Sequence, residues 1–365
     1  MFKDPDNEFE SALKVNDGVE QPPIINPYIK KFYRKEERLG VEYYIDGITK
    51  GNITILSKAI TLIESSLPEH RRIADEVIAK CQKISAMPQS MRIGITGVPG
   101  AGKSTFIEAF GEMIIAHGHK LAVLAIDPSS ERSKGSILGD KTRMETLANN
   151  PAAFIRPSPS AGSLGGVARK SRETILLCEA AGYDVIFIET VGVGQSETAV
   201  HSMSDFFLLL MLSGAGDDLQ GIKRGIMEMS DLIAITKADG SNIEKATLAK
   251  ALYANALHLF PPTESGWTPT ALTSSAVTKE GLTEILEKIE EYFALARGNG
   301  YYAKRRREQA RYWMYESINE SLKEMFYDNA TITKLLCEYE NAVLNGSLES
   351  FSAANELIEK YKSID

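Results

Sequence analysis

Residues Gly97 to Ser104 carry the clearest chemistry in the sequence, because they match the pattern G-x-x-x-x-G-K-[ST]. Glycines let the backbone turn sharply, so that successive N–H groups can point at phosphate oxygens. The amine of Lys103 is expected to reach the outer phosphates of a nucleotide, and the hydroxyl of Ser104 is expected to ligate Mg²⁺. An ordinary glycine turn is the alternative, but an apolar run before the pattern and a helical pattern after it supply the required context. The expected nucleotide contacts are Gly97, Pro99, Gly100, Ala101, Gly102, Lys103, Ser104 and Thr105.

Acidic residues stand at the ends of two other apolar runs. Asp127 follows Leu121–Ile126, and Glu189 closes Asp184–Glu189. Carboxylates in these places suit Mg²⁺ beside a nucleotide. Asp140 lies in a polar stretch that could act as a switch segment, although read alone it fits a helix N-cap better. The expected metal ligands are Ser104, Asp127, Asp140 and Glu189.

A glycine-rich stretch follows Glu189 and is typical of a loop that closes on a γ-phosphate. Within it, Gln195 could orient the attacking water, and an ordinary polar loop residue fits equally well. The expected catalytic residues are Lys103, Asp140, Glu189 and Gln195.

A further strand-end motif, Thr236-Lys237-Ala238-Asp239, indicates which base the nucleotide carries. The carboxylate of Asp239 can accept two hydrogen bonds from the guanine N1–H and amino group, and adenine lacks this donor pair. A buried site built for that pair rejects the wrong base by roughly 10⁴-fold. Lys237 is expected to lie along the ring. The backbone N–H groups of Ser274, Ser275 and Ala276 are expected to complete the base pocket.

Apolar runs that alternate with helical patterns must bring these residues together. We expect strands at Arg92–Thr96, Leu121–Ile126, Asp184–Glu189, Phe206–Leu212, Leu232–Thr236 and Thr270–Thr273. Continuous apolar strands separated by helices are typical of a parallel sheet buried on both faces. Ligands in such folds lie beyond the carboxyl ends of the strands. The sequence therefore predicts an α/β P-loop NTPase domain with a mostly parallel central sheet.

Helical and polar segments surround this domain on both sides. We predict an N-terminal arm at 1–38, a helical extension at 39–90, the nucleotide domain at 91–295 and a C-terminal helical region at 296–365. Ile53, Leu56, Ile60, Ile63 and Leu67 recur at helical spacing, and Pro68 is expected to begin the next helix. The C-terminal region carries apolar faces that need a partner, and its basic run at 304–307 is expected to be a solvated helix face.

The composition excludes several classes of protein. The chain has 365 residues, 43% of them hydrophobic, and a formal net charge of −8, which argues against a nucleic-acid binder. Three widely spaced cysteines predict neither a disulfide framework nor a zinc site, and they fit a reducing cytoplasm. The N-terminal residues lack an apolar signal core, and no apolar run is long enough to cross a membrane.

Taken together, six motifs resemble the MeaB/ArgK family of P-loop GTPases, which includes the methylmalonic aciduria type A proteins: GVPGAGKST, DPSS, GDKTRM, ETVGVGQSE, SGAGDDLQGIK and KAD. The resemblance implies a SIMIBI-type G domain, in which the acidic strand lies beside the P-loop strand. It further implies a GTP-hydrolysing chaperone of an adenosylcobalamin-dependent acyl-CoA mutase, most typically methylmalonyl-CoA mutase. Such a chaperone gates cofactor loading and protects the mutase. Family members form homodimers through C-terminal helices.

Carried over by motif, Lys103 and Ser104 correspond to the phosphate and Mg²⁺ ligands, and Lys223 lies in the loop that couples partner binding to hydrolysis. Hydrolysis is expected to be slow without the mutase, because no arginine finger is evident. One position departs from the usual N-K-x-D pattern, since Thr236 stands where G proteins carry Asn. We expect Asp239 to preserve guanine selectivity, with weaker affinity.

Two other functions remain open at this point. An ATPase or kinase that serves amino-acid transport would use the same phosphate loop, but Asp239 argues against adenine. A nickel-enzyme metallochaperone GTPase belongs to the same broad class, but the chain has only 5 histidines and no histidine tract.

Overall fold

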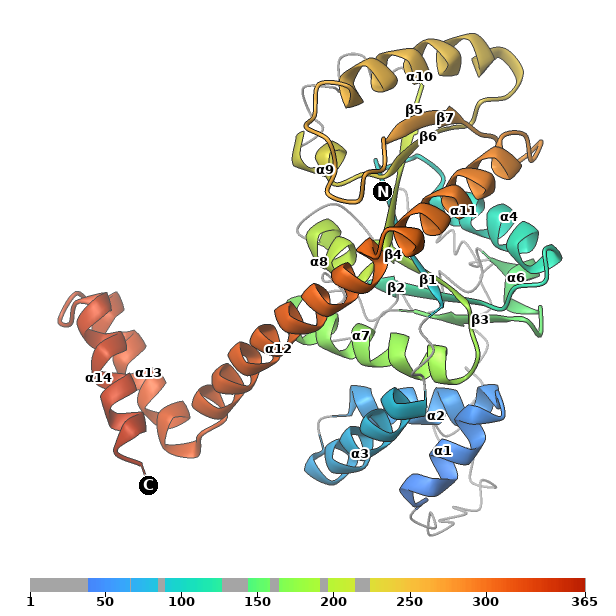
Figure 1. Cartoon of the computed structure of the whole chain (residues 1–365). Coiled ribbons are helices and arrows are strands. Elements are labelled where there is room, and N and C mark those ends of the chain that lie inside the picture. Colours follow the sequence, from blue (N-terminus) through green and yellow to red (C-terminus); the bar gives the residue numbers. More distant parts are fainter. Residues whose placement is uncertain are drawn as a thin grey trace, which may run out of the picture. The chain divides into compact units, whose positions relative to one another are not determined.

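The structure is a computed structural model of the whole chain (Figure 1). It describes residues 39–65, 67–84, 89–126, 144–157, 164–190, 196–213 and 224–364. The predicted arm at 1–38 lies outside these residues. Within the described part of the chain, no helix is long and apolar enough to span a membrane.

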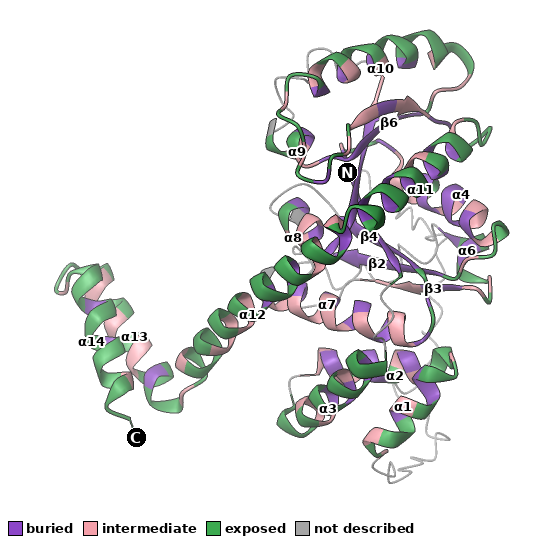
Figure 2. Cartoon of the chain, viewed as in Figure 1, coloured by how far each residue is buried: buried purple, intermediate pink, exposed green. Residues whose placement is uncertain are grey.

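A seven-stranded sheet forms the centre of the chain, with the order β3-β2-β4-β1-β5-β6-β7 and parallel pairing throughout. The predicted parallel sheet is therefore confirmed, and the P-loop strand β1 lies beside the acidic strand β4, as expected of a SIMIBI-type G domain. The central strands are buried along their length (Figure 2). The strands are β1 (Met91–Gly97), β2 (Leu121–Ile126), β3 (Ala153–Arg156), β4 (Val185–Thr190), β5 (Phe206–Leu212), β6 (Leu232–Thr236) and β7 (Thr270–Thr273).

The strand β3 is absent from the sequence-based prediction. It has only 4 residues and lies at the edge of the sheet, where it pairs with β2. Ala153 and Phe154 are buried, whereas Ile155 and Arg156 are partly exposed. So short an apolar run gives too weak a pattern to identify a strand, and β3 forms because β2 offers an unpaired edge.

Helices cover both faces of the sheet (Figure 1). On one face, Phe106 and Phe110 of α4 and Ile285 and Ile289 of α11 share a core with alternate side chains of β1, β4 and β5. On the other face, α10 packs on β6 and β7, while α7 and α8 pack on β2, β4 and β1. These helices and their short neighbours are α4 (Lys103–Ala116), α6 (Glu145–Ala148), α7 (Leu164–Ala180), α8 (Ser196–Met203), α9 (Arg224–Glu228), η2 (Gly240–Asn242), α10 (Ile243–Leu257) and α11 (Leu282–Gly298).

Three N-terminal helices pack against α7: α1 (Val41–Thr49), α2 (Ile53–Glu64) and α3 (Pro68–Ile84). The predicted helical spacing is confirmed for Ile53 to Ile63, and so is the start at Pro68. It is wrong for Leu67, which lies beyond the end of α2 and is exposed. Asn52 caps α2, because its side-chain oxygen accepts hydrogen bonds from the N–H groups of Thr54 and Ile55. Arg71 of α3 forms an ion pair with Glu173 of α7 at 3.2 Å. This layer therefore covers the outer side of α7.

The C-terminal region consists of α12 (Tyr301–Tyr327), α13 (Ala330–Leu344) and α14 (Ser350–Lys362). The expectation that the basic run of α12 is a solvated face is wrong for half of it. Lys304 and Arg307 are exposed, but Arg305 and Arg306 point inward. Consecutive residues on a helix point to different faces, so a run of basic residues in the sequence does not show which side chains form ion pairs with buried acids.

Arg306 belongs to a buried charge cluster made of Arg92, Glu179, Asp205 and Arg306. Two nitrogens of Arg92 lie 2.8 Å from the two oxygens of Glu179. Arg306 lies 3.1 Å from Glu179 and 2.5 Å from Asp205. Burial alone would raise the pKa of Glu179, but the charges of Arg92 and Arg306 outweigh it and hold this pKa at about 2. The cluster thus ties α12 to β1, α7 and the start of β5.

Replacing Glu179 by Gln should lower the free energy of unfolding by about 3 kcal/mol near neutral pH, because two buried guanidinium groups lose a shared countercharge. The folded pKa of Glu179 is about 2, against an ordinary value of 4.5. A depressed pKa contributes stability that is present above about pH 4.5 and is lost as the pH falls towards 2. Urea unfolding at about pH 7, 4 and 3 should therefore show that the free energy of unfolding falls more steeply with falling pH for the native chain than for the variant.

Glu291→Gln is the matched control, because Glu291 pairs with Lys288 while its side chain is 53% exposed. It should change the unfolding free energy by less than about 0.5 kcal/mol. Parallel pH profiles for the native chain and Glu179→Gln would contradict the assigned charge of Glu179.

Candidate functional site

The loop between β1 and α4 has a backbone that glycine makes possible. Gly100 and Gly102 have φ values of 81° and 78°, in the left-handed region that other residues rarely adopt. A Cβ on Gly97 would lie 2.5 Å from the carbonyl oxygen of Leu210 on β5. Gly102 is the N-cap of α4, and no side chain caps that end. The first N–H groups of α4 therefore have no side-chain cap, and the helix dipole favours an anion at this end.

Lys103 begins α4 and lies over this loop. Its Nζ donates a hydrogen bond to the carbonyl oxygen of Gly97 at 3.1 Å. Burial lowers the pKa of Lys103, while the nearby carboxylates of Glu189 and Glu197 raise it in part. The loop thus holds a partly desolvated amine, whose attraction to a phosphate is stronger than it would be in water.

Glu189 lies at the end of β4, next to the P-loop strand. It pairs in register with Ile95 of β1 and is 5% exposed. Just beyond this pair, the hydroxyls of Thr96 and Thr190 are 2.9 Å apart and join the two strand ends. The predicted neighbourhood of the P-loop and Glu189 is therefore present.

Glu197 is a residue of this region that the sequence analysis did not select. It lies in the first turn of α8, is buried, and acts on Lys103 through its charge. The available signal was its place at the far end of ETVGVGQSE, the motif that Glu189 opens. Helix α8 therefore interacts electrostatically with Lys103 of the phosphate loop through Glu197.

The donor set at this edge suits Mg²⁺, because a hydroxyl and a carboxylate are oxygen ligands of the kind that hard cations prefer. Ser104 and Glu189 are the two expected metal ligands within the described residues. Asp127 and Asp140 lie outside them, as do Gln195 and Lys223. Among the residues with a described position, no group of three or more His, Cys, Asp or Glu side chains forms a metal site.

The base motif and the Ser274–Ala276 segment meet at the ends of β6 and β7. The hydroxyl of Ser275 donates to Oδ2 of Asp239 at 2.6 Å, and the N–H of Ala238 donates to the carbonyl oxygen of Ser274 at 3.0 Å. The Ser275 oxygen also accepts from the N–H groups of Val277 and Thr278. Asp239 is thus fixed with its carboxylate oriented by a hydroxyl that is itself held in place.

Two of the three N–H groups expected to contact the base are already hydrogen-bonded within the fold. The N–H of Ser274 donates to Ile235 and that of Ser275 donates to Glu280, so neither is available for a base. Ser275 contributes through its hydroxyl instead. The N–H of Ala276 remains a predicted base contact.

Thr236 joins the base motif to the phosphate loop. Its hydroxyl oxygen lies 2.8 Å from the carbonyl oxygen of Ala101 and 3.1 Å from that of Met211, and its one hydrogen is shared between them. Lys237 lies against the same loop, because its Cε is 3.7 Å from where a Cβ on Gly102 would stand. The threonine therefore supports the loop without an amide group.

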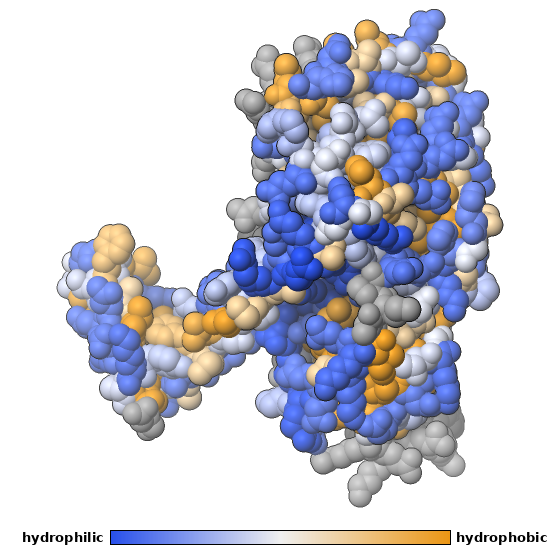
Figure 3. All heavy atoms as spheres, viewed as in Figure 1, coloured by the Kyte–Doolittle hydropathy of each residue, from blue (hydrophilic) through white to orange (hydrophobic). Residues whose placement is uncertain are grey.

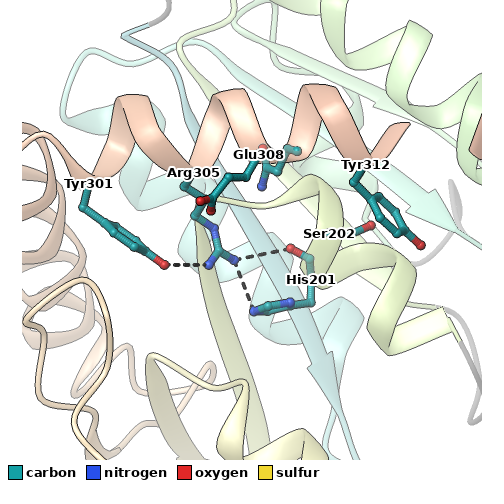
Figure 4. A pocket seen from close by; sticks show the side chains of 7 residues that line it. His201, Ser202, Tyr301, Arg305, Glu308 and Tyr312 are labelled. Atoms are coloured by element: carbon teal, nitrogen blue, oxygen red, sulfur yellow. Dashed lines mark hydrogen bonds between the residues drawn. The ribbon is translucent and has the colours of Figure 1, made fainter. Parts of the chain in front are cut away.

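A cavity of about 200 Å³ lies away from the phosphate loop, at the junction of α8 and α12 (Figure 4). Arg305 lines the cavity and donates to the hydroxyl of Tyr301 at 3.3 Å and to Nε2 of His201 at 3.2 Å. Burial and the charge of Arg305 lower the pKa of His201 to about 3, so this ring is neutral. The residues around the cavity are His201, Ser202, Tyr301, Arg305, Glu308, Gln309 and Tyr312.

This junction connects the phosphate region to the C-terminal helices. Arg305 and Gln309 donate to the carbonyl oxygen of Ser204 at 3.1 and 2.8 Å, and Trp313 donates to that of Ser202 at 3.3 Å. These donors, spaced by one helical turn each, satisfy carbonyls at the C-terminal end of α8. Helix α8 is therefore held by α12 at one end and carries Glu197 at the other.

Comparisons with known proteins agree with this geometry. A profile of the family described as "Methylmalonyl Co-A mutase-associated GTPase MeaB" matches residues 56–331. The chain is 43% identical over 312 residues to the GTPase ArgK of Escherichia coli, covering 86% of this chain and 94% of that protein. It is 44% identical over 337 residues to the mouse protein named "Methylmalonic aciduria type A homolog, mitochondrial", covering 90% and 81%.

A solved structure described as "LAO/AO transport system kinase" superposes with a TM-score of 0.68 at 36% identity, covering 88% of this chain and 97% of that one. The phosphate loop, the adjoining acidic strand and the base motif thus occur on a fold shared with a solved relative. The chain belongs to the MeaB family of methylmalonyl-CoA mutase-associated GTPases.

Proposed function

We propose that this chain binds GTP with Mg²⁺ and hydrolyses it to GDP and phosphate. The main support for the proposal is that one edge of the sheet carries both the phosphate loop and the carboxylate of Asp239, which the hydroxyl of Ser275 orients. Thr236 bonds to Ala101 of the loop, and Ser275 fixes Asp239 at the same edge of the sheet. Guanine offers two donors to that carboxylate and adenine does not, so the site favours GTP over ATP.

Each residue of the site has a role in this proposal. Lys103 and the N–H groups of Gly97–Thr105 bind the phosphates, and Lys237 lies along the base. Ser104 and Glu189, with Asp127 and Asp140, would hold Mg²⁺, which neutralises charge developing on the phosphates when it is bound. Gln195 orients water. Hydrolysis is slow for the chain alone, because within the described residues the charged groups that act on Lys103 of the loop are Glu189 and Glu197, with no Arg among them.

We further propose that the partner is an adenosylcobalamin-dependent acyl-CoA mutase, most typically methylmalonyl-CoA mutase. The family's description names association with methylmalonyl-CoA mutase, and the mouse relative is named for methylmalonic aciduria. In this role the chain gates cofactor loading and protects the mutase. The free cysteines Cys81, Cys178 and Cys337 suit work in a reducing cytoplasm.

The C-terminal helices are proposed to form a homodimer. Tyr315, Ile318, Leu322 and Met325 follow each other at steps of three and four along α12, the spacing of a coiled-coil seam. All four side chains are exposed, at 47 to 60%. Figure 3 shows apolar surface on the helices α12 to α14. A second copy of the same seam would bury it.

The two other functions have less support. The "transport system kinase" relative shares the fold, but the fixed carboxylate of Asp239 does not match adenine. A nickel metallochaperone needs clustered ligands, and the described residues form no cluster of three.

Lys103→Ala should reduce GTP hydrolysis by at least about 10²-fold, because a fixed positive charge no longer stabilises the transferring phosphate. The fold should survive, because the amine of Lys103 bonds locally, to the carbonyl oxygen of Gly97 in the same loop. Phosphate release measures the activity, and circular dichroism measures the fold. The control is Lys288→Ala, because Lys288 is partly exposed and pairs only with its helix neighbour Glu291 among the described ion pairs. Normal turnover by Lys103→Ala would refute the phosphate site.

Asp239→Asn should move the nucleotide preference from GTP towards XTP. Xanthine carries a carbonyl where guanine carries its amino group, so the amide of Asn can donate where the carboxylate accepted. Competition binding with GTP and XTP measures the change, which should exceed about 10²-fold in the ratio of affinities. An unchanged GTP affinity would show that Asp239 does not read the base.

Addition of an adenosylcobalamin-dependent acyl-CoA mutase should raise GTP hydrolysis at least about tenfold, because a partner supplies transition-state contacts that the chain alone lacks. Turnover is measured at increasing mutase concentration, with an unrelated enzyme as the control. A rate that stays flat for every such mutase would leave a GTPase without the proposed partner.

A further inference from the structure

The segment Lys237–Asp239 is held by a side chain that no sequence motif singles out, that of Asn242. Its Nδ2 donates to the carbonyl oxygen of Lys237 at 2.6 Å, and its backbone N–H donates to that of Asp239 at 3.0 Å. Its Oδ1 accepts from the hydroxyl of Ser213 at 2.6 Å. One residue thus contacts both ends of the base-reading segment.

Lys237 is the residue that requires such support. Its φ value is 55°, in the left-handed region, where a residue with a Cβ is strained. Strained residues at functional sites persist when surrounding contacts fix them. The hydrogen bond from Asn242 fixes the carbonyl of Lys237, and the lysine stem then passes Gly102 of the phosphate loop.

The Asn242 side chain serves this segment and not the helix that follows. Asn242 stands at the N-cap position of α10, but its side chain makes no capping hydrogen bond there. Its oxygen instead bonds to Ser213, which directly follows β5. The amide oxygen is thereby committed to Ser213, which leaves the amide nitrogen facing Lys237.

We propose that Asn242 is a positioning residue for guanine-nucleotide binding, oriented by Ser213, and that it acts by holding Lys237 in its left-handed conformation. This inference rests on the proposed GTP site. Asn242 sets the direction of the lysine stem over the base and the position of Asp239 at its edge. Without it, Lys237 relaxes towards ordinary backbone angles and its stem leaves the loop.

Release of fluorescent methylanthraniloyl-GDP tests the proposal on the full chain. Asn242→Ala should release this nucleotide about tenfold faster, and Ser213→Ala should act in the same direction with a smaller effect. Asn242→Ala should raise KM for GTP and leave kcat nearly unchanged. Asn242 is hydrogen-bonded to Lys237 and Ser213, and in the described structure it makes no hydrogen bond to the phosphate loop or to Lys103.

Asn299→Ala is the matched control. Asn299 also uses both ends of its amide, donating to Ser265 at 2.8 Å and accepting from Tyr301 at 3.0 Å, at a place remote in sequence from every nucleotide motif. It should leave nucleotide release unchanged. Equal acceleration by Asn299→Ala would indicate a general loss of stability and overturn the proposal.

A double-mutant cycle with Lys237→Gly separates positioning from simple stabilisation. Glycine adopts a positive φ without strain and has no stem to aim, so Asn242→Ala should add little in that background. Full additivity, or a native release rate for Asn242→Ala alone, would overturn the inference. If the unmodified chain binds no methylanthraniloyl-GDP, the proposed function fails first, and this inference fails with it.

Discussion

One hydroxyl joins the two halves of the candidate nucleotide site. Thr236, at the end of β6, bonds to the carbonyl oxygen of Ala101 in the loop that follows β1. The two strands are not neighbours in the sheet, because β5 lies between them. This bond therefore fixes the position of the phosphate loop relative to the base-reading segment Lys237–Asp239.

The parallel sheet makes this bond possible. When all strands run in one direction, their carboxyl ends lie along one edge, and residues far apart in sequence meet there. Glu189 reaches this edge through β4, Asp239 through β6 and Ser275 through β7. This is why the motifs and the alternating strand pattern, read together, predict both the fold and the location of the site.

What the sequence could not provide were contacts that depend on three-dimensional direction. Because Thr236 stands where G proteins carry Asn, the sequence suggested weaker nucleotide affinity. The hydrogen bond from Thr236 to the phosphate loop could not be foreseen, because it depends on where the carbonyl oxygen of Ala101 lies. The N–H groups of Ser274 and Ser275 are hydrogen-bonded within the fold, and it is the hydroxyl of Ser275 that contacts Asp239. Arg305 and Arg306 turn inward because buried acids and helix-end carbonyls meet them there, and a string of basic letters carries no such information.

We propose that this edge of the sheet selects a guanine nucleotide. Isothermal titration calorimetry of the unmodified chain with GDP and with ADP, both with Mg²⁺, tests it most directly. One GDP should bind per chain, and ADP should bind more weakly by about 10³-fold or more, because adenine leaves the fixed carboxylate of Asp239 unpaired. Equal or tighter binding of ADP would contradict it.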